Sequence, residues 1–159
     1  MRRELDHKHK IIAICILIEW MQRPCFIVVD REHALSISTR KLVIETAKLN
    51  VLTAYSAREA LELLRRFPAV DGMVIDADTQ ELSCAEFVGQ VKEIAPAIPV
   101  ISVSTPLVGL CRQADYHLET FDPGRLLSLL ESLRPAAAAE IERREEQLKA
   151  QELGPGDHI

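Results

Sequence analysis

CFIVVD, at residues 25–30, is an apolar run that ends in a carboxylate. Two further runs have the same form, MVID at 73–76 and VISVS at 100–104. Short apolar runs that are bounded by turn residues and separated by helical patterns are typical of buried parallel strands. Ligands and chemistry lie outside the carboxyl ends of the strands in open α/β sheets. We therefore expect the three residues that end these runs to converge on one edge: Asp30, Asp76 and Ser104.

Two carboxylates and a hydroxyl at one sheet edge suit either a cation site or a place where a phosphoryl group is accepted and sensed. Other kinds of site find less support in the sequence. The chain has only six glycines, with no glycine-rich phosphate loop and no nucleophile elbow. Its five histidines show no shared spacing that would indicate a metal site or a histidine nucleophile.

Composition bounds the class of protein. A chain of 159 residues is long enough for one domain with a core plus tails, and its content of charged residues, 27%, is ordinary for a globular protein. The net charge of -5 argues against a general nucleic-acid surface, because phosphate binding needs a basic face. The four cysteines include no C-x-x-C pair and no metal-ligand spacing. We interpret them as small buried hydrophobic residues in a reducing cytoplasm.

Strand and helix patterns alternate over residues 24–134 and predict one α/β domain with five strands. Helical spacing covers residues 33–49, and capping signals open the three later helices, namely Ser56, Ser83 and Asp122. Residues 1–23 form an N-terminal extension whose apolar run is too short to span a bilayer. An extra packed element, a start codon set too early and an interfacial anchor all fit this extension. Residues 135–159 predict a charged helical tail.

Taken in order, these segments resemble the receiver domain of bacterial response regulators. The resemblance covers residues 24–133 and rests on an ordered set rather than one motif: IVVDRE at 27–32, AREALELL at 57–64, VID at 74–76, IPVISVS at 98–104, and FDP at 121–123 with Tyr116 before it. It implies a flavodoxin-like (CheY-like), doubly wound sheet of five parallel strands in the order 2-1-3-4-5. The connection from Ser104 to Glu119 is short, so the resemblance also implies a shortened fourth helix.

The resemblance assigns roles to four residues. Asp76 holds the position of the phosphoacceptor aspartate, and Ser104 holds that of the hydroxyl that binds the phosphoryl group and switches position. Asp30, Asp76 and Asp78 hold positions that contribute to the Mg²⁺ pocket of the family. A carboxylate that attacks a phosphoryl donor needs such a cation, because its own charge and the charge of the phosphate must be neutralised together.

The sequence departs from the family at three positions. Arg31 replaces a second acidic residue, Glu119 replaces a lysine, and Thr120 replaces a proline. Repulsion between a dication and a cationic side chain about 4 Å away amounts to several kcal/mol at an effective dielectric constant near 20. We therefore expect a degenerate receiver with weak or absent Mg²⁺-dependent phosphorylation. We further expect Arg31 to pair with Asp76, Asp30 or Glu119 in place of the cation.

Three functions compete at this point. The first is a receiver-like module of a two-component or phosphorelay system that acts by protein–protein contact and is not an enzyme. The second is a working phospho-receiver that accepts a phosphoryl group on Asp76 from a histidine kinase with Mg²⁺ as cofactor. The third is a small α/β enzyme that performs metal-assisted hydrolysis with the carboxylate pair.

The partners follow from the first function. We expect a cytoplasmic protein whose partner is a histidine kinase or another signalling protein, with neither nucleic acid nor a membrane span involved. The tail over residues 136–152 is expected to contribute to self-association, as in a homodimer, or to partner docking.

Overall fold

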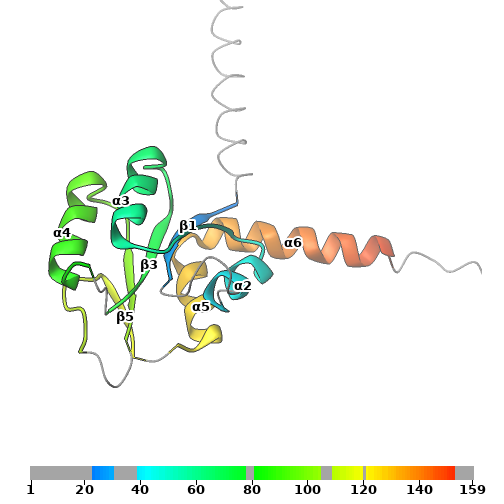
Figure 1. Cartoon of the computed structure of the whole chain (residues 1–159). Helices are drawn as coiled ribbons and strands as arrows, with labels where there is room; N and C mark the ends of the chain where they lie inside the picture. The colour runs from blue at the N-terminus through cyan, green and yellow to red at the C-terminus, as the bar shows by residue number, and fades with distance from the viewer. Residues whose placement is uncertain (1–22, 31–38, 78–80, 105–108, 120, 153–159) are drawn as a thin grey trace, which may run out of the picture. The chain divides into compact units, whose positions relative to one another are not determined.

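Five parallel strands form the sheet at the centre of the fold: β1 (Cys25–Val29), β2 (Asn50–Ala54), β3 (Gly72–Asp76), β4 (Val100–Val103) and β5 (Tyr116–Leu118). Their order is β2-β1-β3-β4-β5, which confirms the predicted strand order. The computed structural model describes residues 23–30, 39–77, 81–104, 109–119 and 121–152 (Figure 1). The helices within these ranges are α2 (Thr39–Thr46), α3 (Ala57–Arg66), α4 (Cys84–Ile94), α5 (Pro123–Leu133) and α6 (Pro135–Glu152).

Helices cover both faces of the sheet, with α3 and α4 on one side and α2 and α5 on the other (Figure 1). Alternate residues of a strand point to opposite faces. Ile27 and Val29 of β1 therefore belong to the core that Leu64 of α3 and Phe87 of α4 complete. Phe26 and the other alternate residues are buried as well. Burial on both faces explains why these strands are continuous apolar runs rather than alternating ones.

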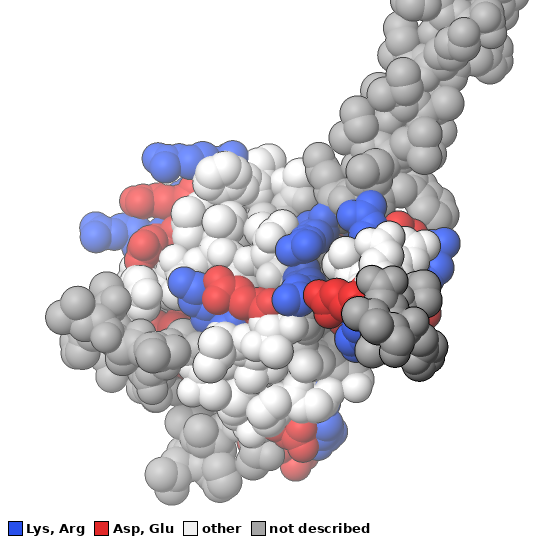
Figure 2. Space-filling view, turned by 90° about the vertical axis from the view of Figure 1, so that its right-hand side faces the viewer, with Lys and Arg blue, Asp and Glu red and all other residues white. Residues whose placement is uncertain are grey.

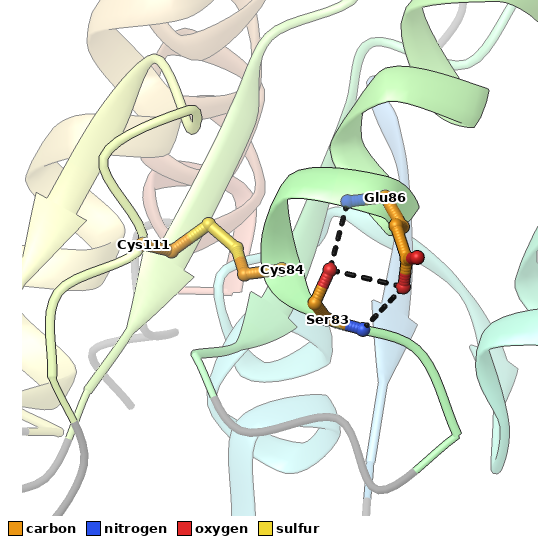
Figure 3. The surroundings of a disulfide bond; sticks show 4 residues. All are labelled: Ser83, Cys84, Glu86 and Cys111. Carbon is orange, nitrogen blue, oxygen red and sulfur yellow. Dashed lines mark hydrogen bonds between the residues drawn. A yellow bond between two sulfur atoms is a disulfide. The ribbon is translucent and has the colours of Figure 1, made fainter.

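Capping side chains start the helices where the sequence predicts them. Ser83 and Glu86 form a complete capping box at the start of α4, in which each side chain accepts the backbone N–H of the other residue (Figure 3). The hydroxyl of Ser56 accepts the N–H of Glu59 at the start of α3, but the Glu59 carboxylate accepts the N–H of Tyr55 instead of completing a box. A third cap, Asp122, opens α5.

The end of α2 differs from the prediction. Helical spacing predicts a helix as far as Leu49, whereas α2 ends at Thr46. Lys48 has a φ of 61°, in the left-handed region, and this turns the chain out of the helix. The N–H of Lys48 then donates to the carbonyl of Glu45, and the N–H of Leu49 donates to that of Ile44. This pair of bonds is a Schellman motif, with lysine at the position that glycine usually occupies.

The connection between β4 and β5 contains no helix in its described part, residues 109–115. Cys111 and Ala114 are buried there, in the same core cluster as α4. The predicted shortening of the fourth helix agrees with this stretch.

The interpretation of the cysteines as small buried hydrophobic residues in a reducing cytoplasm is wrong for two of them. Cys84 and Cys111 form a disulfide (Figure 3), with a Cα–Cα distance of 5.7 Å. Sequence spacing missed the pair because 27 residues separate the two cysteines and only the fold brings them together. Cys25 is free and partly buried. Burial, helped by the nearby carboxylate of Asp71, raises the pKa of its thiol, so this thiol stays protonated near neutral pH.

The chain divides into two compact units, residues 24–133 and residues 1–23 together with 134–159. Within the second unit α6 carries two ion pairs, since Glu140 binds both Arg143 and Arg144. Predictions for residues 1–22 lie outside the described residues. Of the helices that the structure describes, none has the length and apolar character needed to span a membrane.

Candidate functional site

Three predicted site residues lie at one edge of the sheet. The register of β1 against β3, continued by two residues, places Asp30 level with Asp76. Asp76 pairs with Val103 of β4, and Ser104 follows directly. Neighbouring strands lie about 4.8 Å apart, so this register brings two carboxylates and a hydroxyl within reach of one ligand.

All three residues are buried, so their side chains need hydrogen-bonding or charged partners. The exposed fractions are 7% for Asp30, 8% for Asp76 and 4% for Ser104. A carboxylate removed from water is costly unless a cation or hydrogen-bond donors compensate it. A negative pocket at this edge therefore needs a source of positive charge.

Arg40 supplies that charge to Asp76. An Nη2 atom of its guanidinium lies 2.6 Å from Oδ1 of Asp76, and the side chains are only 16% and 11% exposed. Charge-assisted hydrogen bonds of this length are about twice as strong as neutral ones. Removing one partner of a buried pair leaves a bare charge and typically costs about 3–5 kcal/mol. Asp76 is thus neutralised from within the chain.

Phe121 holds the guanidinium from a second side. The Cζ atom of Arg40 lies 5.7 Å from the centroid of its ring, within the range of a cation–π contact. Phe121 precedes α5, and α5 contacts α2, the helix that carries Arg40. The two helices on this face of the sheet therefore position the guanidinium together.

Ser104 is turned toward β5. Its N–H donates to the carbonyl of Leu118 at 2.8 Å, and its hydroxyl donates to the same carbonyl at 3.3 Å. The second bond is long for a hydroxyl donor and hence weak. The hydroxyl is held against the neighbouring strand by a bond that a better acceptor could replace.

The remaining predicted site residues are not part of this cluster as described. Glu119 follows Leu118 and is exposed. Arg31, Asp78 and Thr120 lie outside the described residues, so the predicted pairing of Arg31 stays a prediction. The arginine that does bind Asp76 is Arg40, which the sequence analysis did not single out.

A topological signal could have indicated Arg40. In a strand–loop–helix unit of a parallel sheet, the first turn of the helix lies near the carboxyl end of the preceding strand. Arg40 is the second residue of α2 as described. The sequence analysis found helical spacing over residues 33–49 but gave Arg40 no role at the edge of the sheet.

One of the candidate magnesium ligands is already engaged in an ion pair. Magnesium prefers oxygen ligands in an octahedral arrangement. Here Oδ1 of Asp76 already binds a guanidinium. Across the described part of the chain no group of three or more acidic, histidine or cysteine side chains could hold a metal.

A hollow lies at the opposite, amino-terminal end of the strands. It has a volume of about 380 Å³ and is lined mainly by prolines and small apolar residues of 68–71 and 94–99. Its ionisable side chain is Asp71, whose Oδ2 accepts the N–H of Cys25 at 2.8 Å and so aligns the starts of β1 and β3. We assign this hollow no chemical role.

Several solved structures similar to this chain are receiver domains. A response regulator receiver domain protein from Clostridium thermocellum is 21% identical, with a TM-score of 0.58 over 79% of this chain and 98% of that one. A chemotaxis response regulator of Vibrio cholerae is 25% identical, with a TM-score of 0.57 over 70% and 99%. The receiver domain of a sensor histidine kinase from Pseudomonas aeruginosa, solved with a magnesium ion in its active-site cleft, is 14% identical, with a TM-score of 0.60 over 70% and 98%.

The fold is therefore the CheY-like fold of response-regulator receiver domains, as the sequence predicts. No protein-family model matches the chain, and no curated protein matches it either. The particular function has to be argued from the site.

Proposed function

We propose that this protein is a receiver-like signalling module that acts by protein–protein contact, with weak or no Mg²⁺-dependent phosphorylation of Asp76. One observation carries the proposal, the buried ion pair between Arg40 and Asp76. A phosphoacceptor carboxylate must present a free oxygen to the phosphoryl donor. In this pocket Oδ1 of Asp76 is bound to the guanidinium of Arg40, which contributes positive charge where a cation would otherwise do so.

A working phospho-receiver is the second candidate. Asp30, Asp76 and Ser104 lie together at the carboxyl edge, and the bond from Ser104 to Leu118 is weak enough to exchange. In this alternative, Arg40 leaves Asp76 when a donor and Mg²⁺ arrive, and a histidine kinase supplies the phosphoryl group. No specific feature of the described residues favours the metal-assisted hydrolase.

The partner that we propose is a cytoplasmic signalling protein such as a histidine kinase, rather than a nucleic acid. On the face shown in Figure 2, basic and acidic side chains of the described residues are interspersed. Lys41 and Glu45 of α2 form one such mixed pair. Nucleic-acid binding relies on clustered Lys and Arg, and the net charge of the chain is -5.

Incubation of the full chain with a small acyl phosphate and Mg²⁺, followed by intact-mass measurement, tests the proposal. We expect the wild-type chain to stay unmodified. Stoichiometric acyl-phosphate formation that disappears in Asp76→Asn would contradict the proposal and favour the second candidate.

Arg40→Gln tests whether the guanidinium is what keeps the pocket closed to a cation. The substitution removes the charge and keeps a hydrogen-bond donor, and we expect it to lower the free energy of unfolding by about 1–3 kcal/mol without Mg²⁺. Added Mg²⁺ should then stabilise the variant against urea but leave the wild type unchanged, because ligand binding to the folded state raises its stability.

Lys41→Gln is the matched control, since Lys41 is the next residue, carries the same charge and is 43% exposed. It should change the free energy of unfolding by no more than about 0.5 kcal/mol, and it should leave the response to Mg²⁺ unchanged. Equal Mg²⁺ responses in both variants would mean that Arg40 does not decide cation binding.

A further inference from the structure

The disulfide between Cys84 and Cys111 joins two segments that leave the candidate site. Cys84 is the first residue of α4 and follows Asp76 by eight residues. Cys111 lies in the β4–β5 connection, seven residues after Ser104. The disulfide therefore links the segment that follows Asp76 to the segment that follows Ser104 (Figure 3).

A second attachment holds the same connection farther along α4. Lys92 of α4 binds Oδ2 of Asp115 at 2.7 Å, and that oxygen also accepts the N–H of Val100 at 2.8 Å. Cys84 and Lys92 are eight positions apart, which is about 12 Å along a helix. Residues 111–115 are thus fixed to α4 at both ends, by a covalent bond and by an ion pair.

The segment between these attachments contributes to the core. Cys111 is 2% exposed and Ala114 is 6% exposed, and both belong to the cluster that contains Val88 and Val91 of α4. Cys111 and Ala114 lie in the connection for which the resemblance implied a shortened fourth helix. A segment this short has little packing of its own, so its attachments decide whether it stays in place.

We propose that the Cys84–Cys111 disulfide is a redox-sensitive clasp that fixes the β4–β5 connection against α4 and thereby sets the surface that this side of the domain presents. The proposal rests on the function proposed above, signalling by protein contact from a cytoplasmic location. Disulfides of cytosolic proteins are usually transient and redox-sensing, because the compartment reduces them.

The reduction of the disulfide balances in atoms and electrons when the reductant is a dithiol protein or a small dithiol. One reductant thiolate attacks the sulfur of Cys84, which is the more accessible of the two cysteines, and the sulfur of Cys111 leaves as a thiolate. The second reductant thiol then displaces Cys84 and closes the disulfide of the reductant. Two electrons pass to the protein, and the two protons of the dithiol end on the cysteine sulfurs.

The consequence of reduction is local. The ion pair of Lys92 with Asp115 keeps the far end of the segment in place, while the end at Cys111 is released. Leu110 is 53% exposed and Tyr116 is 38% exposed on either side of the segment, so the change alters apolar surface that a partner protein would contact.

Hydrogen–deuterium exchange on the full chain tests the clasp. Alkylation of the unreduced protein should leave Cys84 and Cys111 unmodified, and reduced dithiothreitol should open the bond without unfolding the sheet. We expect the amides of residues 109–114 to exchange at least about tenfold faster after reduction, while those of β1 and β3 keep their protection. Cys84→Ser with Cys111→Ser should reproduce the reduced pattern without dithiothreitol, and Cys25→Ser is the control.

Several results would overturn the clasp: alkylation of both cysteines in the native protein, reduction only on global unfolding, or identical exchange in the oxidised and reduced forms. None of these readouts depends on the state of Asp76. Robust phosphorylation of Asp76 together with an intact redox response would contradict the proposed function but would still support the clasp.

Discussion

The hydroxyl of Ser102 is buried without a hydrogen bond to any described residue that would compensate for its removal from water. The residue is fully buried in β4, and within the described part of the chain its Oγ has no hydrogen-bond partner. An unsatisfied buried polar group costs about 1–3 kcal/mol, whereas its removal leaves only a small void. Neighbouring Ser104 differs because its hydroxyl has an acceptor in Leu118.

Ser102→Ala is therefore expected to raise the free energy of unfolding by about 1 kcal/mol, measured by urea denaturation. Ser104→Ala is the matched control, because it removes the same atom from a hydroxyl that has a partner, and it should lower stability or leave it unchanged. A loss of stability in Ser102→Ala as large as that in Ser104→Ala would contradict this account.

Asp115 links stability to pH. Partial burial alone would raise its pKa, but the hydrogen bonds from Lys92 and from the N–H of Val100, with the charge of Lys92, outweigh that effect and lower the pKa below the ordinary 3.8. A carboxyl with a lowered pKa in the folded state contributes stability above its unfolded pKa, and this contribution is lost as the pH falls through the folded pKa.

Asp115→Asn should lower the free energy of unfolding by about 1 kcal/mol at neutral pH, since the ion pair is partly exposed. The difference from the wild type should shrink as the pH falls below 3.8, the ordinary value for this group. Urea unfolding over this pH range provides the measurement, and Glu119→Gln, at an exposed carboxyl, is the control. A difference independent of pH would show that the charge of Asp115 does not stabilise the fold.

At the scale of the element, α2 is the helix that carries Arg40. Its C-terminal end contains a residue in an unfavourable backbone conformation. Lys48 adopts a left-handed φ of 61° that closes the Schellman motif. For residues other than glycine this conformation costs about 1 kcal/mol or more. The burial of Leu49, 5% exposed, supplies the apolar contact that usually accompanies the motif.

Lys48→Gly is expected to raise the free energy of unfolding by about 0.5–1 kcal/mol, because glycine adopts this φ without the steric cost. Lys48→Ala keeps the Cβ atom and should bring no such gain. Chemical denaturation of both variants gives the comparison, and equal stabilities would show that the left-handed residue is not what limits the end of α2.

Most elements could be predicted from sequence, and the failures have a common cause. Apolar spacing and caps such as Ser83 and Asp122 act within a few residues, so they located the helices and strands. The bond between Cys84 and Cys111, and the choice of Arg40 as partner of Asp76, depend on segments far apart in the chain.

At the scale of the whole molecule, the strand order was predictable because the ordered segments resemble one family, and the alternation of strands and helices limits the sheet to few topologies. Of the site, the sequence predicted only the three residues at the ends of the strands. Three strand ends meet at one edge by sheet geometry alone, but the groups that compensate their charge come from other elements. The predicted functional roles of all the site residues, Arg31 and Asp78 included, remain predictions.

The helix α6 is the part of the molecule that we expect to contribute to self-association or to partner docking. It extends over Pro135–Glu152, is rich in alanine in its first turns, and exposes 60% of Leu148. Deleting residues 135–159 should lower the mass measured by light scattering from that of a dimer to that of a monomer, and circular dichroism should show that the rest of the chain stays folded.

Leu148→Glu in the full chain is the point-variant form of this test, because a charge at an exposed apolar position opposes burial in an interface. It should shift the mass in the same direction as the deletion. An unchanged mass in both variants, with partner binding intact, would rule out a role of α6 in association.

The pairing of Arg40 with Asp76 has a consequence for the protein over its lifetime. A dissociable ion occupies a site in proportion to its concentration, so a pocket that relies on one follows the metal supply of the cell. A guanidinium on the same chain has no free pool and cannot be chelated or diluted away. Under the proposed function, each newly synthesised copy therefore carries the charge balance of this pocket with it, and metal starvation would leave that balance unchanged.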